Sequence, residues 1–300
     1  MPNTTSKAYD PTLTPREVGA RISHLGIKKA NTKAWQLFIL RVLAGIYISF
    51  GSHLFLVALE QGMGKIVAGA CFGVGLVLVV VAGAELFTGN ITMIVGAITM
   101  LYSPWQLLKN WVVVYVGNFI GAVLTAYFVY KSGIFGHCPH PTSMGTMAIT
   151  ISDYKNSLPF DQAFIRGVFC NMLVILAIIM SYFAKDIISK IVCVIIPVMA
   201  FVASGFEHCV ANMYLLPAGL LAKGIPLSEQ SAIFHNILPV TLGNIVGGLF
   251  IMLIHPNRIR QIAFLLAGKR NSAIEVRQKR GIPGDKSKSE SIYDHEAAIT

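Results

Sequence analysis

Charged side chains are scarce in this sequence. Asp, Glu, Lys and Arg make up 13% of the 300 residues, about half of the 25% that soluble domains usually carry. Hydrophobic residues make up 54%, and the mean hydropathy is +0.64. Apolar runs of about 20 residues recur along the chain, which is the length that a helix needs to cross a bilayer. The shortage of charge therefore argues against a soluble domain and predicts a membrane protein.

Three further features are missing. The apolar runs do not alternate as the strands of a membrane barrel do, so they favour helices, whose backbone hydrogen bonds are satisfied within each segment. The first 33 residues lack the apolar core of a signal peptide. Four of the five cysteines lie in apolar runs, and neither they nor His137 and His140 have the spacing of a disulfide framework or metal site. We expect an all-α membrane protein with no metal and no cofactor.

Basic residues gather at the two ends of the chain. Six of the 24 Lys and Arg residues precede position 34 and nine follow position 255, within a formal net charge of +10. Because positive charge marks cytoplasmic segments, this distribution predicts cytoplasmic termini and an even number of spans. The anionic inner leaflet accounts for the charge, so we do not expect nucleic acid as a partner.

The apolar runs divide the chain into an arm, a transport domain and a tail. Residues 1–34 form a cytoplasmic arm, in which an amphipathic helix is expected from about Pro15 to Trp35. Residues 35–255 hold six spans, in two repeats of about 35–130 and 162–255, joined by an extracytoplasmic loop over 131–161. The last segment, 256–300, is a basic cytoplasmic tail that we expect to be partly disordered.

Polar residues interrupt the second and fifth spans at matched places. Both interruptions read Gly-x-Glu-x-x-x-x-Asn, at 83–90 and 205–212, which are 122 residues apart. Gly-Asn-x-x-Gly recurs at 117–121 and 243–247, and Arg166 follows Arg41 by 125 residues. Helix is expected to resume near Ile91 and Met213, and Pro217 to end or kink the second piece. Because each copy has three spans, an odd number, the second copy enters the membrane from the opposite side and the repeat is inverted. Polar breaks at matched places in two such copies indicate a transport site near the bilayer midplane.

The shared polar residues of the two breaks have a bracing role in this interpretation. A broken span exposes backbone N–H groups at the start of its second half-helix, where they carry partial positive charge. Glu85 and Asn90, and their counterparts Glu207 and Asn212, are expected to hold the interrupted backbone rather than to touch a substrate.

His208 breaks the symmetry, because its counterpart in the first repeat is Leu86. A buried imidazole tends to be neutral, since desolvation disfavours its charged form. It can then offer an N–H to a small anion or relay a proton. Thr88 also has an apolar counterpart, Val210, and its hydroxyl could orient His208 or the substrate. An ordinary, hydrogen-bonded core histidine stays open as the alternative.

Bulky apolar residues surround these polar positions. Ordinary packing explains them, but constrictions around one imidazole would also stop hydrated ions and pass small, nearly neutral species. The residues are Phe72, Leu76, Leu86, Phe87 and Phe201.

Two other functions are weaker alternatives. An intramembrane hydrolase could use Ser204 and His208, one helical turn apart, but a nucleophile and base also need an oxyanion site and an orienting group. A water or glycerol channel would carry paired Asn-Pro-Ala loops, whereas Asn212 is followed by Met213. We therefore expect a transporter or channel and not an enzyme.

Three motifs together resemble the formate/nitrite transporter family, in particular its bacterial formate channels. They are Glu85-Leu86-Phe87-Thr88-Gly89-Asn90, Ala203–His208 followed by Ala211-Asn212-Met213, and Pro239–Asn244. The resemblance covers about residues 35–255. It implies an aquaporin-like protomer of six spans with two broken helices, a homopentamer with one pore per protomer, and a multi-pass protein of the cell membrane. It also implies transport of small monovalent anions or their acids.

The resemblance further implies roles for single residues. His208 is similar to the family's central pore histidine, and Thr88 to the threonine of its first broken loop. Asn171 and Asn244 resemble its pore asparagines, and the five apolar residues named above fall at its two constrictions. Lys155 resembles a lysine near the outer mouth, where a cation would attract anions. Formate is the foremost expected substrate, crossing in a protonated or proton-coupled form, with nitrite, hydrosulfide, acetate and lactate as alternatives.

Overall fold

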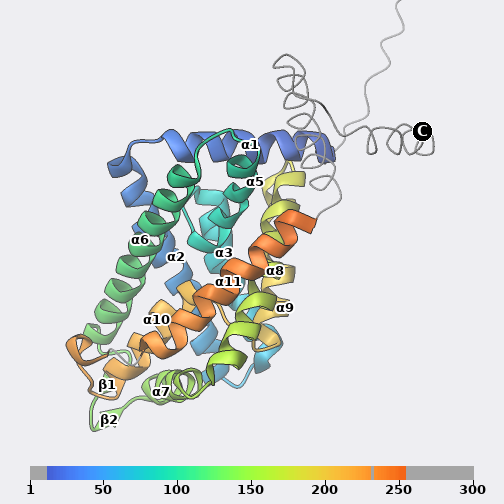
Figure 1. Cartoon of the computed structure of the whole chain (residues 1–300). Coiled ribbons are helices and arrows are strands. Elements are labelled where there is room, and N and C mark those ends of the chain that lie inside the picture. The colour runs from blue at the N-terminus through green and yellow to red at the C-terminus, as the bar shows by residue number, and fades with distance from the viewer. Residues whose placement is uncertain (1–11, 231–232, 255–300) are drawn as a thin grey trace, which may run out of the picture. The chain divides into compact units, whose positions relative to one another are not determined.

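Figure 1 shows the computed structural model of the chain, in which residues 12–230 and 233–254 are described. The predicted tail, 256–300, lies outside the described residues. The described part is almost entirely helical. Its helices are α1 (Pro15–Asn31), α2 (Ala34–Glu60), α3 (Gly64–Ala82), α4 (Phe87–Asn90), η1 (Ile91–Met93), α5 (Ile94–Ile98), α6 (Pro104–Lys131), α7 (Ser143–Asn156), α8 (Phe160–Phe183), α9 (Ile187–Ala203), α10 (Cys209–Ala222), η2 (Leu227–Glu229) and α11 (Phe234–Ile254).

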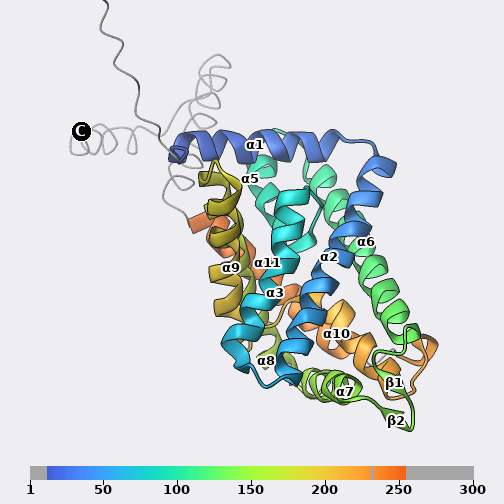
Figure 2. The same cartoon turned by 180° about the vertical axis from the view of Figure 1, so that it is seen from behind.

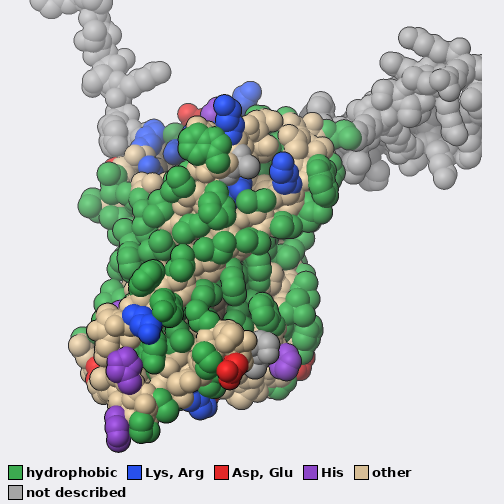
Figure 3. All heavy atoms as spheres, turned by 90° about the vertical axis from the view of Figure 1, so that its left-hand side faces the viewer, with side chains coloured by type: hydrophobic (Ala, Val, Ile, Leu, Met, Phe, Trp, Pro, Cys, Tyr) green, Lys and Arg blue, Asp and Glu red, His purple; other side chains and the backbone are tan. Residues whose placement is uncertain are grey.

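Five of the described helices are long and apolar enough to cross a membrane. They are α3, α6, α8, α11 and the Phe38–Glu60 part of α2, with mean hydropathies from 1.9 to 2.4. Three shorter apolar segments accompany them, namely Phe87–Ile98, α9 with 17 residues and α10 with 14. Hydrophobic side chains cover the middle of the face in Figure 3, whereas charged side chains lie mainly towards its two ends.

The helix α1 lies across one end of the molecule (Figure 1). Thr14 and Glu17 form a capping box at its start, with Pro15 in the first turn. Val18 and Ile22 are buried beneath it. The amphipathic helix predicted for the arm is therefore present, and it ends at Asn31 rather than near Trp35.

The two halves of the chain run in opposite directions between the α1 end and the α7 end. Figures 1 and 2 show α2 and α6 starting beside α1, and α8 and α11 starting beside α7. Glycines hold each helix pair closely together. A Cβ atom at Gly121 of α6 would lie 2.1 Å from the Val42 carbonyl oxygen of α2, and one at Gly243 of α11 would lie 2.1 Å from that of Phe164 in α8. No side chain fits at either contact.

The prediction of a loop over 131–161 was wrong, because this segment contains a helix and a hairpin. Strands β1 (Gly136–His137) and β2 (His140–Pro141) pair antiparallel, and α7 follows. Thr142 caps α7 by accepting a hydrogen bond from the Gly145 N–H, at 3.1 Å. Only three residues of α7 are buried. Packing against α10, rather than a clear apolar pattern in the sequence, accounts for this helix.

The two breaks are shorter than the sequence suggested. Gly83 and Gly205 adopt positive φ angles of 81° and 73° just after α3 and α9, a conformation that favours glycine. Helix resumes at Phe87 and Cys209, four residues before the predicted starts. Thr88, Asn90 and Asn212 therefore lie on the first turns of the new helices, whereas Glu85, Glu207 and His208 precede them. Pro217 does not end α10, which continues to Ala222, because every residue of this helix is buried and packing holds it.

Candidate functional site

One asparagine on α6 fixes the first break. The side-chain oxygen of Asn118 accepts a hydrogen bond from the Phe87 N–H at 2.8 Å, at the start of α4. Its amide donates to the carbonyl oxygens of Arg41 at 2.7 Å and Glu85 at 2.9 Å. Asn118 is fully buried. It therefore supplies partners to two backbone groups of the break, those of Phe87 and Glu85, and ties them to Arg41 of α2.

Asn244 on α11 fixes the second break in the same way. It accepts from the Cys209 N–H at 2.9 Å and donates to the carbonyl oxygens of Gly167 at 2.8 Å and Glu207 at 2.9 Å. Asn244 follows Asn118 by 126 residues, and Gly167 follows Arg41 by the same number. The structural counterpart of Arg41 is thus Gly167, so the predicted match between Arg41 and Arg166 was wrong by one residue.

The two glutamates hold matched polar clusters. In the first half, the Asn90 amide donates to the Glu85 carboxylate at 2.8 Å and to the Asn110 side-chain oxygen at 2.9 Å. Lys29 of α1 lies 3.3 Å from the same carboxylate and donates to the Asn90 side-chain oxygen at 2.6 Å. The cluster ties α1, α4 and α6 together around one buried carboxylate.

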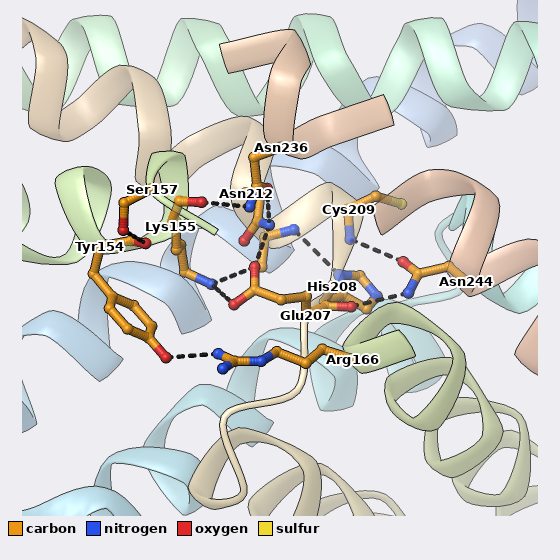
Figure 4. Close-up of polar contacts among 11 residues, drawn as sticks. Tyr154, Lys155, Ser157, Arg166, Glu207, His208, Cys209, Asn212, Asn236 and Asn244 are labelled. Atoms are coloured by element: carbon orange, nitrogen blue, oxygen red, sulfur yellow. Dashed lines mark hydrogen bonds and ion pairs between the residues drawn. The ribbon is translucent and has the colours of Figure 1, made fainter. Parts of the chain in front are cut away.

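In the second half, Figure 4 shows the equivalent cluster around Glu207. Asn212 donates to its carboxylate at 2.6 Å and to the Asn236 side-chain oxygen at 2.7 Å. Lys155 of α7 pairs with Glu207 at 2.8 Å and 2.9 Å. The Asn236 amide also donates to the Lys155 carbonyl oxygen at 2.8 Å. The glutamate carboxylates thus bind side chains, whereas the asparagines on α6 and α11 hold the interrupted backbone.

Sequence reasoning missed the roles of Lys29, Asn110, Asn118 and Asn236. A usable signal was nevertheless present. Lys29 and Lys155, like Asn110 and Asn236, are separated by the same 126 residues as the Gly-Asn-x-x-Gly motifs. A search for identical residues at that constant separation would have found them, and would have shown that α1 and α7 correspond.

His208 and Thr88 meet between the two breaks. The Thr88 hydroxyl oxygen lies 3.0 Å from the His208 Nε2 atom, and both residues are buried. The Nδ1 atom accepts a hydrogen bond from the Ala211 N–H at 3.1 Å, so the imidazole caps α10. Because Nδ1 is an acceptor, the neutral ring carries its proton on Nε2 and donates it to the Thr88 hydroxyl.

A cavity of about 350 Å³ on the α7 side leads to this imidazole. Phe72 and Phe201 line it and contact each other edge to face, with ring centroids 5.8 Å apart. The Phe201 ring stacks on His208 with a centroid distance of 6.1 Å, and the Phe72 ring lies at 6.5 Å. The imidazole therefore lies beside two apolar rings and next to a space large enough for a small molecule.

The other predicted apolar residues occupy different surroundings. Leu76 and Leu86 are buried, and Leu86 stands immediately before α4, as His208 stands immediately before α10. The Phe87 ring packs on α6 instead, 4.9 Å from the Tyr115 ring and 6.5 Å from the Trp111 ring. The structure thus brings Phe72 and Phe201 to the imidazole, but it orients Phe87 towards α6.

Asn171 of α8 connects the first break, at Thr88, with Asn244 of α11. Its amide donates to the Asn244 carbonyl oxygen at 2.6 Å and to the Thr88 carbonyl oxygen at 3.4 Å. Its side-chain oxygen is buried and has no hydrogen-bond partner in the part of the chain that the structure describes. Asn171 can therefore offer an acceptor beside Thr88. Asn244 cannot, because its side chain is fully engaged with the break.

Lys155 lies on the wall of the cavity, at the side where α7 covers α10. Its ammonium group keeps 12% of side-chain exposure while paired with Glu207. Arg166 lies at the same end and donates to the Tyr154 hydroxyl at 2.6 Å (Figure 4). Lys155 and Lys65 line the cavity together with the Glu207 carboxylate, and Arg166 lies at the same end.

This arrangement gives His208 no partner for nucleophilic catalysis. Both ring nitrogens are engaged, one by Ala211 and one by Thr88. Within residues 12–230 and 233–254, Ser204 makes no hydrogen bond to the imidazole, and no group of three His, Cys, Asp or Glu residues could hold a metal ion. The geometry instead places one donor and one hydroxyl together at the cavity's imidazole, where the two half-helices start.

Comparison with known proteins gives a consistent result. Residues 16–256 match the formate/nitrite transporter family. A probable formate transporter of Methanothermobacter thermautotrophicus is 39% identical over 254 residues, which cover 78% of this chain and 92% of that protein. The formate channel FocA of Escherichia coli K12 is 32% identical over 262 residues, covering 79% of this chain and 90% of that protein.

Solved structures agree with these sequence matches. A pentameric formate channel with formate bound superposes with a TM-score of 0.61 at 34% identity, covering 75% of this chain and 95% of that one. An ion channel of the same family gives a TM-score of 0.68 at 30% identity, with coverages of 79% and 95%. These relatives are channels and transporters rather than enzymes. With its apolar helices, the chain is a membrane protein and belongs to the formate/nitrite transporter family.

Proposed function

We propose that this chain forms a pore for small monovalent anions, with formate as the foremost substrate. The observation that carries the proposal is the Thr88–His208 pair, which lies beside Phe72 and Phe201 at the inner end of the cavity. Two relatives named above are called formate transporter and formate channel, which supports formate over nitrite, hydrosulfide, acetate and lactate. These four anions stay as alternatives that would pass by the same mechanism.

The proposed protomer has six spans, formed by two inverted three-helix repeats with an aquaporin-like arrangement. In this arrangement α2, α6, α8 and α11 are continuous, while α3 with α4–α5 and α9 with α10 form the two broken spans. Support comes from the opposite directions of the two halves and from the matched hydrogen bonds of Asn118 and Asn244. The half-helices start next to each other, with their free N–H groups near the pore centre.

The mechanism follows from the physical cost of charge in this passage. Lys155 and the starts of the half-helices attract the anion into the cavity. A full charge at the bilayer centre costs from about 3 to over 10 kcal/mol, so we expect the anion to take up a proton as it loses water. The proton comes from vestibule water directly, or from Nε2 of His208, which takes a replacement proton from water through the Thr88 hydroxyl in the same step and so stays neutral. The neutral acid passes the apolar rings and releases its proton on the far side, so one anion and one proton cross together.

Flux through reconstituted protein tests the proposal. Uptake of labelled formate into proteoliposomes should fall at least tenfold in His208→Phe and clearly in Thr88→Val. Cys138→Ser, which changes an exposed residue far from the pair, serves as the control. A panel of formate, nitrite, hydrosulfide, acetate and lactate, measured from pH 5 to 8, would identify the substrate and show whether uptake needs a proton gradient. Unchanged formate flux in both variants would contradict the assigned roles.

The proposed assembly is a homopentamer in the cell membrane, with both termini in the cytoplasm. The pentameric formate channel that resembles this chain supports the stoichiometry. Native mass spectrometry of the detergent-released complex should give five times the 32.6 kDa chain mass. A smaller assembly that still transports formate would show that one protomer suffices.

A further inference from the structure

The two matched clusters differ in one hydrogen bond. At the α7 end, the Asn236 amide donates to the Lys155 carbonyl oxygen. At the α1 end, Asn110 is the counterpart of Asn236 and is only 4% exposed. The Nδ2 atom of Asn110 nevertheless has no hydrogen-bond partner among the described residues. A buried donor without a partner is costly, so this position favours an acceptor that the described chain does not supply.

Arg41 is a second unsatisfied donor at the same end. The residue is 3% exposed, and its counterpart at the α7 end is Gly167. Its Nε atom is buried without a hydrogen-bond partner, and no ion pair within 4.0 Å is formed to the guanidinium by any residue in 12–230 or 233–254. Glu85 acts on it electrostatically, but that carboxylate is already bound by Lys29 and Asn90. A guanidinium has five N–H donors, so most of its capacity is unused.

Arg41 and Asn110, which carry the two unpaired donors, both lie at the contact between α2 and α6. A Cβ atom at Gly117 of α6 would lie 2.5 Å from the Arg41 Cβ atom, so Arg41 points from α2 towards α6. Both helices start at the α1 end (Figure 2), and side chains lean towards the start of their helix. The guanidinium is therefore directed towards the part of α6 that precedes Gly117. Asn110 lies there, two turns earlier on the same face of α6.

Buried charge also differs between the two ends. At the α7 end, Lys155 and Glu207 neutralise each other, and the further cation, Arg166, is not buried and donates to the Tyr154 hydroxyl. At the α1 end, Lys29 and Arg41 stand against the single carboxylate of Glu85, which leaves one positive charge in excess. An unpaired buried charge is strongly unfavourable unless an opposite charge joins it.

We propose that the α1 end carries an anion-loading site, in which the Arg41 guanidinium and the Asn110 amide bind a small carboxylate. The α7 end lacks this pair of donors, because the Asn236 amide is already bonded and Gly167 stands in place of Arg41. The proposal rests on the proposed function, since it names a further site on the same anion path. Only a small anion fits, because both residues are already nearly enclosed.

Flux measured separately from each side tests this site. Full-length protein is reconstituted into liposomes, and its orientation is determined by labelling Cys138, the exposed cysteine beside the hairpin at the α7 end, with a membrane-impermeant thiol reagent. In Arg41→Gln, we expect the half-saturating formate concentration to rise about tenfold for uptake from the α1 end, equivalent to about 1.4 kcal/mol. Uptake from the α7 end should be unchanged. Lys109→Gln removes an exposed charge next to Asn110 and should behave as wild type.

A binding measurement separates this proposal from the proposed function. Formate should raise the melting temperature of the detergent-solubilised wild-type protein, and this stabilisation should shrink in Arg41→Gln and in Asn110→Ala but largely persist in Arg41→Lys. Equal effects of Arg41→Gln on both sides, or full stabilisation by formate in that variant, would overturn the loading site. A phospholipid found bound to wild type and absent from Arg41→Gln would also overturn it. Absence of formate flux in wild type would instead contradict the proposed function.

Discussion

At the scale of single residues, two asparagines hold the backbone where the helices are interrupted. Asn118 and Asn244 each make three hydrogen bonds to main-chain groups. Such groups have no water to bind inside a bilayer, so their partners must come from the protein. The positions of His208 and Thr88 depend on this support, because each lies within one turn of a backbone group that an asparagine fixes.

Replacing Asn244 by Leu should therefore destabilise the fold. The change leaves the Cys209 N–H and the carbonyl group of Glu207 buried without partners, at about 1–3 kcal/mol for each group. We expect a loss of at least about 2 kcal/mol in the free energy of unfolding in mixed micelles. Asn31→Leu, at an exposed position, should change it by no more than about 0.5 kcal/mol. Equal stability of the two variants would show that the main-chain bonds of Asn244 are dispensable.

The Lys155–Glu207 pair makes a second residue-scale prediction. Glu207→Leu leaves the Lys155 charge unpaired, and breaking a buried pair typically costs about 3–5 kcal/mol. The double variant Glu207→Leu/Lys155→Met should recover part of that loss, because no lone charge remains. The exposed Lys223–Asp153 pair, with side-chain exposures of 46% and 49%, provides the comparison. Lys223→Met should change stability by less than about 1 kcal/mol. A double variant no more stable than Glu207→Leu argues against an unpaired-charge effect.

At the scale of elements, α7 owes its place to close contact with α10. A Cβ atom at Gly219 would lie 2.3 Å from the Ser152 Cβ atom and 2.4 Å from the Ala148 carbonyl oxygen. The Ser152 hydroxyl also donates to the Leu216 carbonyl oxygen at 3.1 Å. Because α7 carries Lys155, this contact sets the distance between that cation and the cavity.

A graded series at Gly219 tests this packing. Gly219→Ala should lower stability by about 1–3 kcal/mol, as overpacked cores do, and Gly219→Val should lower it further. Combining Gly219→Ala with Ser152→Gly removes the closest atom and should restore part of the loss. The measurement is thermal unfolding, together with formate flux as a report on the position of Lys155. No difference between the Ala and Val variants would mean that α7 moves freely away from α10.

The same elements show what the sequence could and could not predict. Long apolar runs predicted the repeats 35–130 and 162–255, and these bounds lie within a few residues of the starts of α2 and α8 and the ends of α6 and α11. Burial in lipid leaves a continuous apolar signal. The helix α7 was missed, because its stability comes from contacts with α10 rather than from an apolar stripe. The starts of α4 and α10 were placed four residues late, because the polar residues Thr88, Asn90 and Asn212 were interpreted as loop although they lie within helix.

The site was predicted in part for the same reasons. Comparison of the two repeats identified His208 and Thr88 because their counterparts are apolar. The structure places the Thr88 hydroxyl oxygen 3.0 Å from the His208 Nε2 atom. The comparison could not show that Phe87 points towards α6, since the direction of a side chain on a short helix depends on where that helix starts. It also could not show that Arg41 is buried, because the sequence comparison used this residue only as a repeat marker.

At the scale of the whole molecule, the α1 end and the α7 end are distinct faces. The helix α1 lies across one end, towards which α11 runs, and the opposite end carries α7 and the β1–β2 hairpin, whose turn contains Cys138 (Figure 1). The excess of basic residues near the chain ends predicts that the α1 end faces the cytoplasm.

Labelling of Cys138 tests this orientation. A membrane-impermeant maleimide added to intact cells that express the protein should label wild type and not Cys138→Ser. The remaining cysteines lie in α3, α8, α9 and α10, within apolar segments that an aqueous reagent does not enter. Labelling that appears only after the cells are permeabilised would place the hairpin in the cytoplasm and reverse the proposed topology.

The cavity on the α7 side has a pharmacological consequence. Its volume of about 350 Å³ lies at the lower end of the range that drug-sized compounds occupy. A flat, apolar inhibitor with one hydrogen-bond acceptor could rest against Phe72 and Phe201 and reach the ammonium group of Lys155. Such a compound would block from the outside of the cell under the proposed topology, so it would need no route across the membrane to act.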